Sequence, residues 1–360
     1  MKEEQQNGRP WVRLLGSLAA VALVLTAVSG WSLAAEDAAL SCAGVSGRTL
    51  VPLGQTVGIK LFSQGVLVVG LSEVATAEGN LSPAKECGLK EGDIITHINS
   101  EQVDTIEAVK EVLQELEGET MSIRAVRGER QLQLTGEAVK CSVDGVYKLG
   151  AWIRDSMAGI GTLTWYDPDT GIFAALGHGI NDVDTSLLMP LQTGTIMTST
   201  VTGVEKGEKG DPGQLHGAFD LNSDLGTLYA NTAAGIFGTA SKDFALSGQA
   251  IPVADRSQVK VGAATIWSNV DGREVKEYEV EILRVYPHSE GETRNLMLKV
   301  TDPALLEATG GIVQGMSGSP ILQDGKLVGA VTHVLVNDPT CGYGILAENM
   351  LEEGRAANCA

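Results

Sequence analysis

The fold of this chain is decided by the stretch Gly311-Ile312-Val313-Gln314-Gly315-Met316-Ser317-Gly318-Ser319-Pro320. Glycine permits left-handed backbone and the close approach of another chain, so the stretch predicts a tight turn rather than a helix or a strand. A serine in such a turn has the surroundings of a nucleophile, and the amides of Gly315 and Ser317 would form an oxyanion hole. The alternatives are a glycine-rich hairpin turn without chemistry, or Ser319 as the nucleophile.

Residues 315–320 resemble the Gly-Asp-Ser-Gly-Gly-Pro nucleophile turn of chymotrypsin-like serine peptidases. Other segments are similar to the SpoIVB peptidase family (stage IV sporulation protein B, family S55): Val300-Thr301-Asp302-Pro303, Thr309-Gly310-Gly311 and Gly329-Ala330-Val331-Thr332-His333-Val334. The resemblance implies a mainly β chain, in which an N-terminal transmembrane anchor and a small α+β PDZ domain precede a chymotrypsin-like double β-barrel. It also implies that Ser317 is the nucleophile.

A serine nucleophile needs a base, and the base needs an orienting group. His178 lies between two glycines directly after a predicted strand, and the resemblance implies that it is the base. From the residues alone, the third member of the triad is open among Asp182, Asp184 and Asp302. The resemblance points to Asp302 as the carboxylate that orients the imidazole.

His333 lies on the strand predicted after the nucleophile turn. In such folds this strand helps to shape the pocket for the residue before the scissile bond, so we expect His333 to line that pocket. The alternative is an ordinary surface or core histidine. His216 and His288 have no acidic or cysteine partners at metal-ligating spacing, so no metal site is predicted.

Charge and cysteine content exclude several classes of function. The 360 residues include 45 acidic and 26 basic side chains, for a formal net charge of −19 at pH 7. Nucleic-acid binding needs clustered lysine and arginine to neutralise phosphate, so no nucleic-acid partner is expected. The 5 cysteines are scattered without Cys-x-x-Cys spacing, which indicates neither a disulfide framework nor a zinc site. No glycine pattern for a nucleotide follows a strand into a helix, and no cofactor is predicted.

The N-terminal region has the pattern of a membrane segment. An uncharged apolar run at residues 14–35 follows Arg13 and precedes Glu36-Asp37. Its length suits a ~30 Å hydrocarbon core, and the flanking charges favour an N-terminus inside the cell. We expect residues 1–36 to be a cytoplasmic stub and an uncleaved anchor, with a cleaved signal peptide as the alternative. Residues 37–47 are predicted to be a linker.

Residues 48–140 are predicted to form the PDZ domain. The segment from Gly88 to Asn99 resembles the most recognisable PDZ signature, and apolar residues recur with helical spacing over 106–116. The resemblance places the peptide-binding loop and strand at four nearby residues: Val57, Gly58, Ile59 and Leu61. PDZ domains bind a C-terminal or extended peptide by adding it as a strand to a sheet edge, so such a peptide is an expected partner.

Residues 141–360 are predicted to form an all-β peptidase domain. Strand, turn and strand signals follow one another over 161–176, and several short apolar or alternating runs come later. Many short strands separated by turn signals are typical of barrels and sandwiches.

The resemblance implies a serine endopeptidase of endospore-forming bacteria, exported and anchored in the forespore membrane so that it faces the intermembrane space. Such an enzyme cleaves itself near its N-terminus, here between Ala35 and Gly58, and is thereby released. It then cuts a membrane-tethered regulator, which releases an intramembrane metalloprotease and activates the late sigma factor of the mother cell. Two alternatives are an inactive PDZ and peptidase-like scaffold, and an extracytoplasmic quality-control serine protease.

Overall fold

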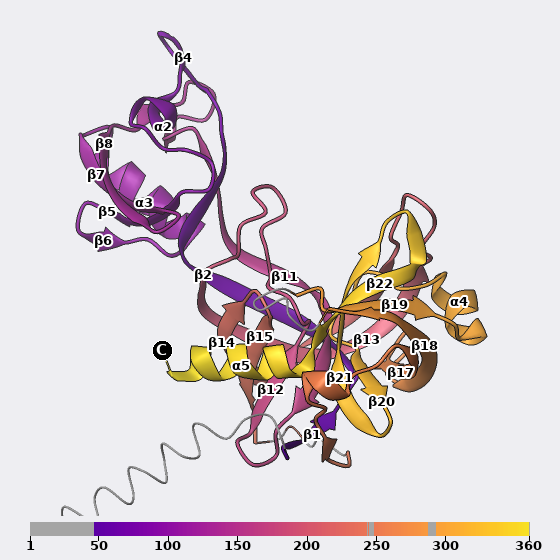
Figure 1. The fold of residues 1–360 in the computed structure, drawn as a ribbon. Helices are drawn as coiled ribbons and strands as arrows, with labels where there is room; N and C mark the ends of the chain where they lie inside the picture. The colour runs from indigo at the N-terminus through magenta and orange to yellow at the C-terminus, as the bar shows by residue number, and fades with distance from the viewer. Residues whose placement is uncertain (1–46, 243, 245–247, 287–292, 360) are drawn as a thin grey trace, which may run out of the picture. The chain divides into compact units, whose positions relative to one another are not determined.

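The computed structural model describes residues 47–242, 244, 248–286 and 293–359. The predicted anchor and almost all of the predicted linker lie outside these residues. Among the residues that are described, no helix is long and apolar enough to cross a membrane. The architecture is mainly β, with two barrels and a small α+β PDZ domain, which confirms the predicted fold class (Figure 1). The predicted order is wrong, because the PDZ domain lies between two strands of the first barrel and does not precede it.

The first barrel is a closed ring of strands within a larger sheet. Its members pair in this order: β2 (Thr56–Leu71), β11 (Ala151–Tyr166), β12 (Ile172–Ala175), β15 (Gly235–Ala240), β14 (Gln214–Thr232), β13 (Leu191–Glu205) and back to β2. The short strands β1 (Thr49–Pro52) and β16 (Ile251–Pro252) extend the sheet beside β11. Alternating apolar residues of these strands, such as Phe173 and Ile236, fill the interior.

The second barrel is built from the C-terminal part of the chain. Its pairing order is β17 (Gly262–Ser268), β18 (Lys276–Val285), β19 (Leu296–Val300), β22 (Asp338–Leu346), β21 (Lys326–Leu335) and β20 (Pro320–Gln323). The short helix α4 (Pro303–Thr309) follows β19, the 3-10 turn η1 (Arg256–Gln258) precedes β17, and α5 (Ala347–Cys359) ends the chain. The core of this barrel includes Met316, which is fully buried one residue before Ser317.

The PDZ domain is an insertion in the hairpin formed by β2 and β11. These two strands pair continuously from Leu71↔Ala151 to Thr56↔Thr162, apart from two bulges. The elements between them are β3 (Val74–Thr76), β4 (Gly79–Leu81), α2 (Pro83–Glu86), β5 (Ile94–Ile98), β6 (Glu101–Gln102), α3 (Ile106–Leu116), β7 (Met121–Arg127), β8 (Arg130–Gly136), β9 (Val139–Lys140) and β10 (Tyr147–Lys148). Helix α3 matches the predicted helix, and its buried face packs on strands of this insertion.

The predicted PDZ peptide-binding residues lie elsewhere. Val57, Gly58, Ile59 and Leu61 belong to the half of β2 that lies in the first barrel, where β11 pairs with one edge and β13 with the other. A peptide can add as a strand only to an unpaired edge. The prediction for these four residues is therefore wrong, and the start of the predicted PDZ range 48–140 belongs to the peptidase barrel.

Candidate active site

The nucleophile turn is held against strand β11 of the first barrel. The amide of Thr162 donates to the carbonyl of Ser317 at 3.0 Å, and the Thr162 hydroxyl donates to the carbonyl of Gly315 at 2.8 Å. Gly318 has a φ of +99°, and a Cβ there would overlap with the carbonyl oxygen of Thr162. Only glycine allows this approach, and it joins the two barrels at Ser317.

Two amides of the turn are free to bind an oxyanion. Neighbouring amides are used locally, since Met316 donates to Val313 and Ser319 donates to Met316. Within the described part of the chain, the amides of Gly315 and Ser317 donate no hydrogen bond. Unused backbone donors beside a nucleophile are what a tetrahedral intermediate needs.

His178 follows the end of β12 on a strained backbone. Leu176, with a φ of 70°, precedes Gly177 at 69°, and a non-glycine residue in this region is uncommon and often found at functional sites. A Cβ at Gly177 would lie 2.9 Å from the Cγ2 of Thr332, so a glycine there lets the histidine segment approach strand β21. Glycine at position 177 thus allows the segment that carries His178 to pack on the second barrel.

The imidazole has a defined tautomer. Its Nδ1 lies 2.8 Å from the carbonyl oxygen of Gly179. A carbonyl oxygen can only accept, so Nδ1 carries the proton and Nε2 of the neutral ring carries a lone pair. Burial lowers the pKa of His178 below 6.5, against the opposing effect of this hydrogen bond, so the ring is neutral at pH 7.

His333 packs against His178 rather than pointing to solvent. The two ring centroids are 5.1 Å apart. Nδ1 of His333 is buried and has no hydrogen-bond partner among the described residues. Burial, together with the charge of Arg294 and that of His178 when it is protonated, lowers the pKa of His333 to about 4. A neutral His333 therefore packs against the ring of the proposed base.

One cavity of about 300 Å³ is lined by His178 and Ser317, whereas His333 is not among its lining residues. Its wall contains the side chains of His178 and Ser317 together with Gly315, and strand β11 supplies much of the rest. The remaining lining residues are Ile59, Met157, Ala158, Gly159, Ile160, Leu176, Gly179, Ile180, Asn181 and Gln314. In this arrangement the Ser317 hydroxyl donates to the carbonyl of Thr332 at 2.7 Å.

Ser319 does not share this cavity. It is fully buried, and its hydroxyl donates to Ser268 at 3.1 Å. Two residues after Ser317, the alternative nucleophile thus faces the core of the second barrel.

Asp302 has a different role in this structure. It is the N-cap of α4, where its Oδ1 accepts from the amides of Ala304 and Leu305 at 2.9 and 3.0 Å. Its Oδ2 accepts from the amide of Glu279 at 3.3 Å. The structure does not join Asp302 to His178 by a hydrogen bond, and its role as the orienting carboxylate stays a prediction.

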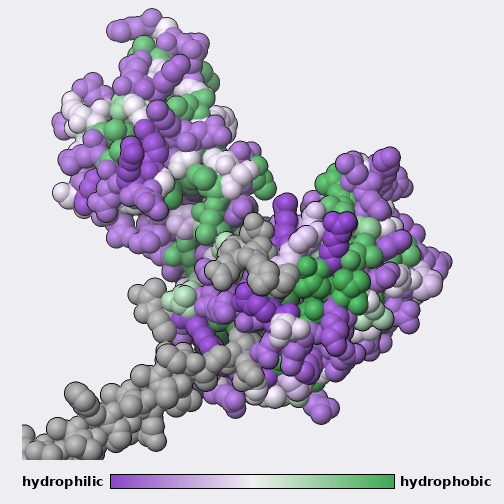
Figure 2. Space-filling model, in the orientation of Figure 1, coloured by the Kyte–Doolittle hydropathy of each residue, from purple (hydrophilic) through white to green (hydrophobic). Residues whose placement is uncertain are grey.

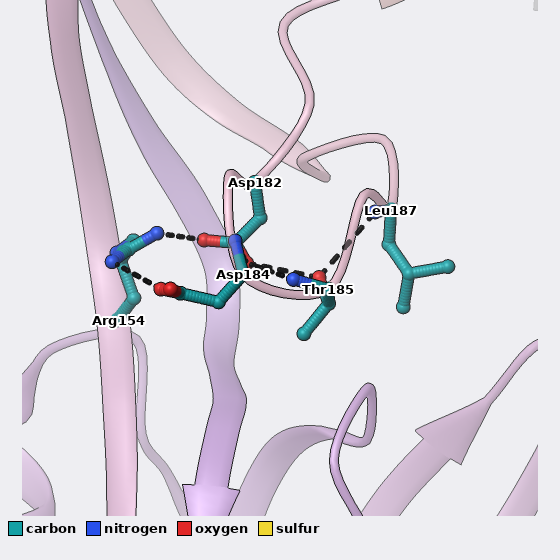
Figure 3. Close-up of polar contacts among 5 residues, drawn as sticks. All are labelled: Arg154, Asp182, Asp184, Thr185 and Leu187. Atoms are coloured by element: carbon teal, nitrogen blue, oxygen red, sulfur yellow. Dashed lines mark hydrogen bonds and ion pairs between the residues drawn. The ribbon is translucent and has the colours of Figure 1, made fainter.

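Asp182 and Asp184 serve the loop that follows His178. Both carboxylates pair with the guanidinium of Arg154 on β11, and the Arg154 to Asp184 distance is 2.8 Å (Figure 3). Oδ1 of the buried Asp182 also accepts from the amide and hydroxyl of Thr185. Burial opposes ionisation of Asp182, but the bonds from Thr185 and the charge of Arg154 outweigh it and lower its pKa.

Asn231 is a positioning residue that the sequence did not reveal. Its Oδ1 accepts from the amide of Ile180 at 2.8 Å, and its Nδ2 donates to the carbonyls of Ile180 and Met189. Asn231 thus holds the segment after His178 at Ile180 and Met189, and Arg154 holds it between these two residues. No group of three or more histidine, cysteine, aspartate or glutamate side chains gathers at metal-binding distance in the residues described.

Two models of known protein families match this chain. Residues 145–351 match the family model described as SpoIVB peptidase S55, and residues 77–127 match that of a PDZ domain. No curated protein matches the chain. The first match extends over more than half of the chain and includes His178, Ser317 and His333.

Solved structures match at low identity. The PDZ domain of the SdrC-like protein from Listeria monocytogenes is 21% identical, with 25% of this chain and 87% of that one covered and a TM-score of 0.21. The active form of the Rv3671c protease from M. tuberculosis is 14% identical, with 54% and 72% covered and a TM-score of 0.31. The HtrA-type protease AlgW with a decapeptide is 12% identical, with 57% and 53% covered and a TM-score of 0.33.

Proposed function

Because this chain belongs to the SpoIVB peptidase S55 family and is a serine endopeptidase, we propose that Ser317 attacks the scissile carbonyl and that His178 accepts its proton. The observation that carries this assignment is the single cavity that contains His178, Ser317 and the two free amides. The tautomer of His178 supports it, since the lone pair on Nε2 is what a general base offers.

The proposed reaction has two steps. The Ser317 hydroxyl leaves the carbonyl of Thr332, gives its proton to Nε2 of His178 and adds to the scissile carbonyl, while the amides of Gly315 and Ser317 hold the oxyanion of the tetrahedral intermediate. His178 protonates the amine as the C–N bond breaks, which leaves the acyl-enzyme. A water molecule deprotonated by His178 then attacks the acyl group, and His178 returns the proton to the Ser317 oxygen as the acid is released. The carbonyl of Gly179, which holds Nδ1, supplies the orientation that a carboxylate supplies in other triads.

The cellular role that we propose follows the family. The enzyme is exported and membrane-anchored in the forespore, cleaves its own N-terminal segment and then cuts a membrane-tethered regulator of an intramembrane metalloprotease. That cut activates the late sigma factor of the mother cell. We place self-cleavage between Ala35 and Arg48, because β1 begins at Thr49 and a cut beyond it would detach a strand that pairs with β11.

The test combines a serine-directed phosphonylating probe with mass spectrometry of the mature N-terminus. We expect the probe to label Ser317, and we expect a new N-terminus between Ala35 and Arg48 in the wild-type protein but not in a Ser317→Ala variant. Labelling at another residue, or normal processing of the variant, would refute the assignment.

A second function, an inactive scaffold that tethers partners, is favoured by one observation. The Ser317 hydroxyl donates to Thr332, and His178 donates to Gly179. A folded wild-type protein that the probe fails to label, and that still binds peptides, would support the scaffold.

The pH dependence of kcat/KM tests His178 as the base. A general base must be neutral, and burial lowers the pKa of His178 below 6.5. We therefore expect kcat/KM to fall on the acid side with a midpoint below pH 6.5. Initial rates on a peptide substrate between pH 4 and pH 9 measure it, and a midpoint above pH 6.5 contradicts the prediction.

An Asp302→Asn variant separates the two roles of Asp302. Asparagine is as good an N-cap as aspartate, so the variant keeps α4 but loses the charge. Since both carboxylate oxygens accept from backbone amides, we expect kcat to change by less than about threefold. A loss of about 10⁴-fold with an unchanged fold would instead show that Asp302 orients His178 during catalysis.

A further inference from the structure

Strand β11 has an unpaired edge that runs from the PDZ insertion to the catalytic cavity. Strand β2 pairs with one edge of β11 from Ala151 to Thr162. On the other edge, β12 joins only from Leu163 onward. In the described part of the chain, no strand pairs with that edge between Ala151 and Gly161. We call this segment the free β11 edge.

The hydrogen bonds of Thr162 and Leu163, at the C-terminal end of the free β11 edge, show which backbone groups of β11 face that edge. Thr162 donates through its amide to Ser317 and accepts through its carbonyl from Leu176, whereas the next amide, that of Leu163, donates to Gln55 on the opposite side. The pairing with β2 is regular from Ser156 to Thr162. Alternate residues point the same way, so the amides and carbonyls of Ala158 and Ile160 face the free β11 edge.

This end of the edge belongs to the active site. Residues 157–160 line the cavity that contains His178 and Ser317. Ala158 and Gly159 are exposed in the part of the chain that the structure describes. A peptide held by Ala158 and Ile160 would therefore lie beside the nucleophile.

The other end of the edge lies in the PDZ insertion next to α3. The amide of Ile106, at the start of this helix, donates to Asp155 on β11 at 3.0 Å. Trp152 is 66% exposed, and Leu71 on the paired strand is 36% exposed. Figure 2 shows hydrophobic surface along the hairpin of β2 and β11, and further hydrophobic surface over the second barrel. A large exposed aromatic residue on a strand with one unpaired edge can serve as a binding anchor.

We propose that the free β11 edge binds one extended segment of the polypeptide substrate, from the catalytic cavity to Trp152. This inference rests on the proposed function and adds the mode of substrate recognition. Ile160 and Trp152 are eight residues apart, a span of ~26 Å in a strand. The substrate is therefore an unfolded stretch that continues about eight residues beyond the cavity, and a short peptide lacks the contact with Trp152.

The first test measures binding without hydrolysis. Fluorescence anisotropy follows a labelled peptide that copies residues 35–48 as it binds to a Ser317→Ala protein. We expect a Trp152→Ala substitution in that protein to raise Kd by about 10-fold. The matched control is Val261→Ala, which removes another apolar side chain that is 62% exposed, and Kd should then stay unchanged. An equal Kd in all three proteins would overturn the proposal.

The second test changes the peptide instead of the protein. N-methylation of alternate amides in the same peptide removes the donors that pair with a strand, so one of the two alternating sets should raise Kd by about 10-fold. If both N-methylated peptides bind as tightly as the parent peptide, the proposed strand pairing on β11 is wrong, even if Trp152→Ala raises Kd.

The third test separates this proposal from the proposed function. For the wild-type enzyme, we compare kcat/KM of a six-residue peptide centred on the mapped scissile bond with that of peptides extended by eight residues on either side. We expect one extension to raise kcat/KM by about 10-fold and Trp152→Ala to remove that gain. Equal kcat/KM for the short and the extended peptides contradicts substrate binding along the free β11 edge. Binding of the peptides without any cleavage contradicts only the assignment as a peptidase.

Discussion

Replacing Ser317 by alanine is expected to lower kcat for peptide hydrolysis by about 10⁴-fold or more while the protein stays folded. The hydroxyl is the nucleophile, and no other hydroxyl in the cavity lining could replace it, since Ser317 is the only serine, threonine or tyrosine among those residues in the described part of the chain. In the resting structure this hydroxyl makes one hydrogen bond, to Thr332. Its loss should cost only about 1 kcal/mol of stability.

Ser319→Ala is the matched control for Ser317→Ala. It removes the same hydroxyl group two residues later, where the side chain bonds with Ser268 in the core. We expect kcat within about threefold of wild type and a loss of stability of about 1 kcal/mol. Steady-state kinetics and urea unfolding of both variants measure the two quantities. Activity in Ser317→Ala, or its loss in a folded Ser319→Ala protein, would move the nucleophile assignment to Ser319.

The part of the site that depends on short-range sequence could be predicted. The glycines around Ser317 and His178 indicate turns because their backbone conformation excludes most other residues. These turns end where strands of the two barrels meet, so both side chains enter one cavity. The mainly β fold followed from the same local signals of strand and turn.

The errors come from long-range pairing. Val57 to Leu61 has the alternation of a strand, but the residues alone do not tell whether β13 or a bound peptide lies at its edge. Asn231 acts on Ile180 from 51 residues away, and Arg154 acts on Asp182 from 28 residues away. Asp302-Pro303 is a common helix start, and the structure shows this local role, whereas the role of Asp302 in orienting His178 stays a prediction.

Replacing Arg154 by methionine is expected to destabilise the protein by ~2–3 kcal/mol and to lower kcat by about 10-fold. Asp182 is only 1% exposed, and removal of its cationic partner leaves a buried carboxylate that keeps its bonds from Thr185 but loses its compensating charge. Because those bonds remain, we expect a smaller loss of unfolding free energy than the largest values seen when one partner of a buried ion pair is removed. The loop after His178 loses its anchor on β11 (Figure 3), and small displacements of a catalytic base reduce the rate strongly.

The pH dependence distinguishes loss of this pair from a general packing defect in Arg154→Met. The pKa of Asp182 is lowered in the folded state, so its ionised form stabilises the fold above its ordinary pKa, and that contribution disappears as the pH falls through the lowered value. The difference in unfolding free energy between wild type and variant should thus be full at pH 7 and shrink toward pH 3 in urea titrations. Lys148→Met, which breaks the exposed pair with Asp144, is the matched control and should change neither stability nor kcat measurably. A pH-independent difference for Arg154→Met would mean that its aliphatic packing, rather than its charge on Asp182, holds the loop that positions His178.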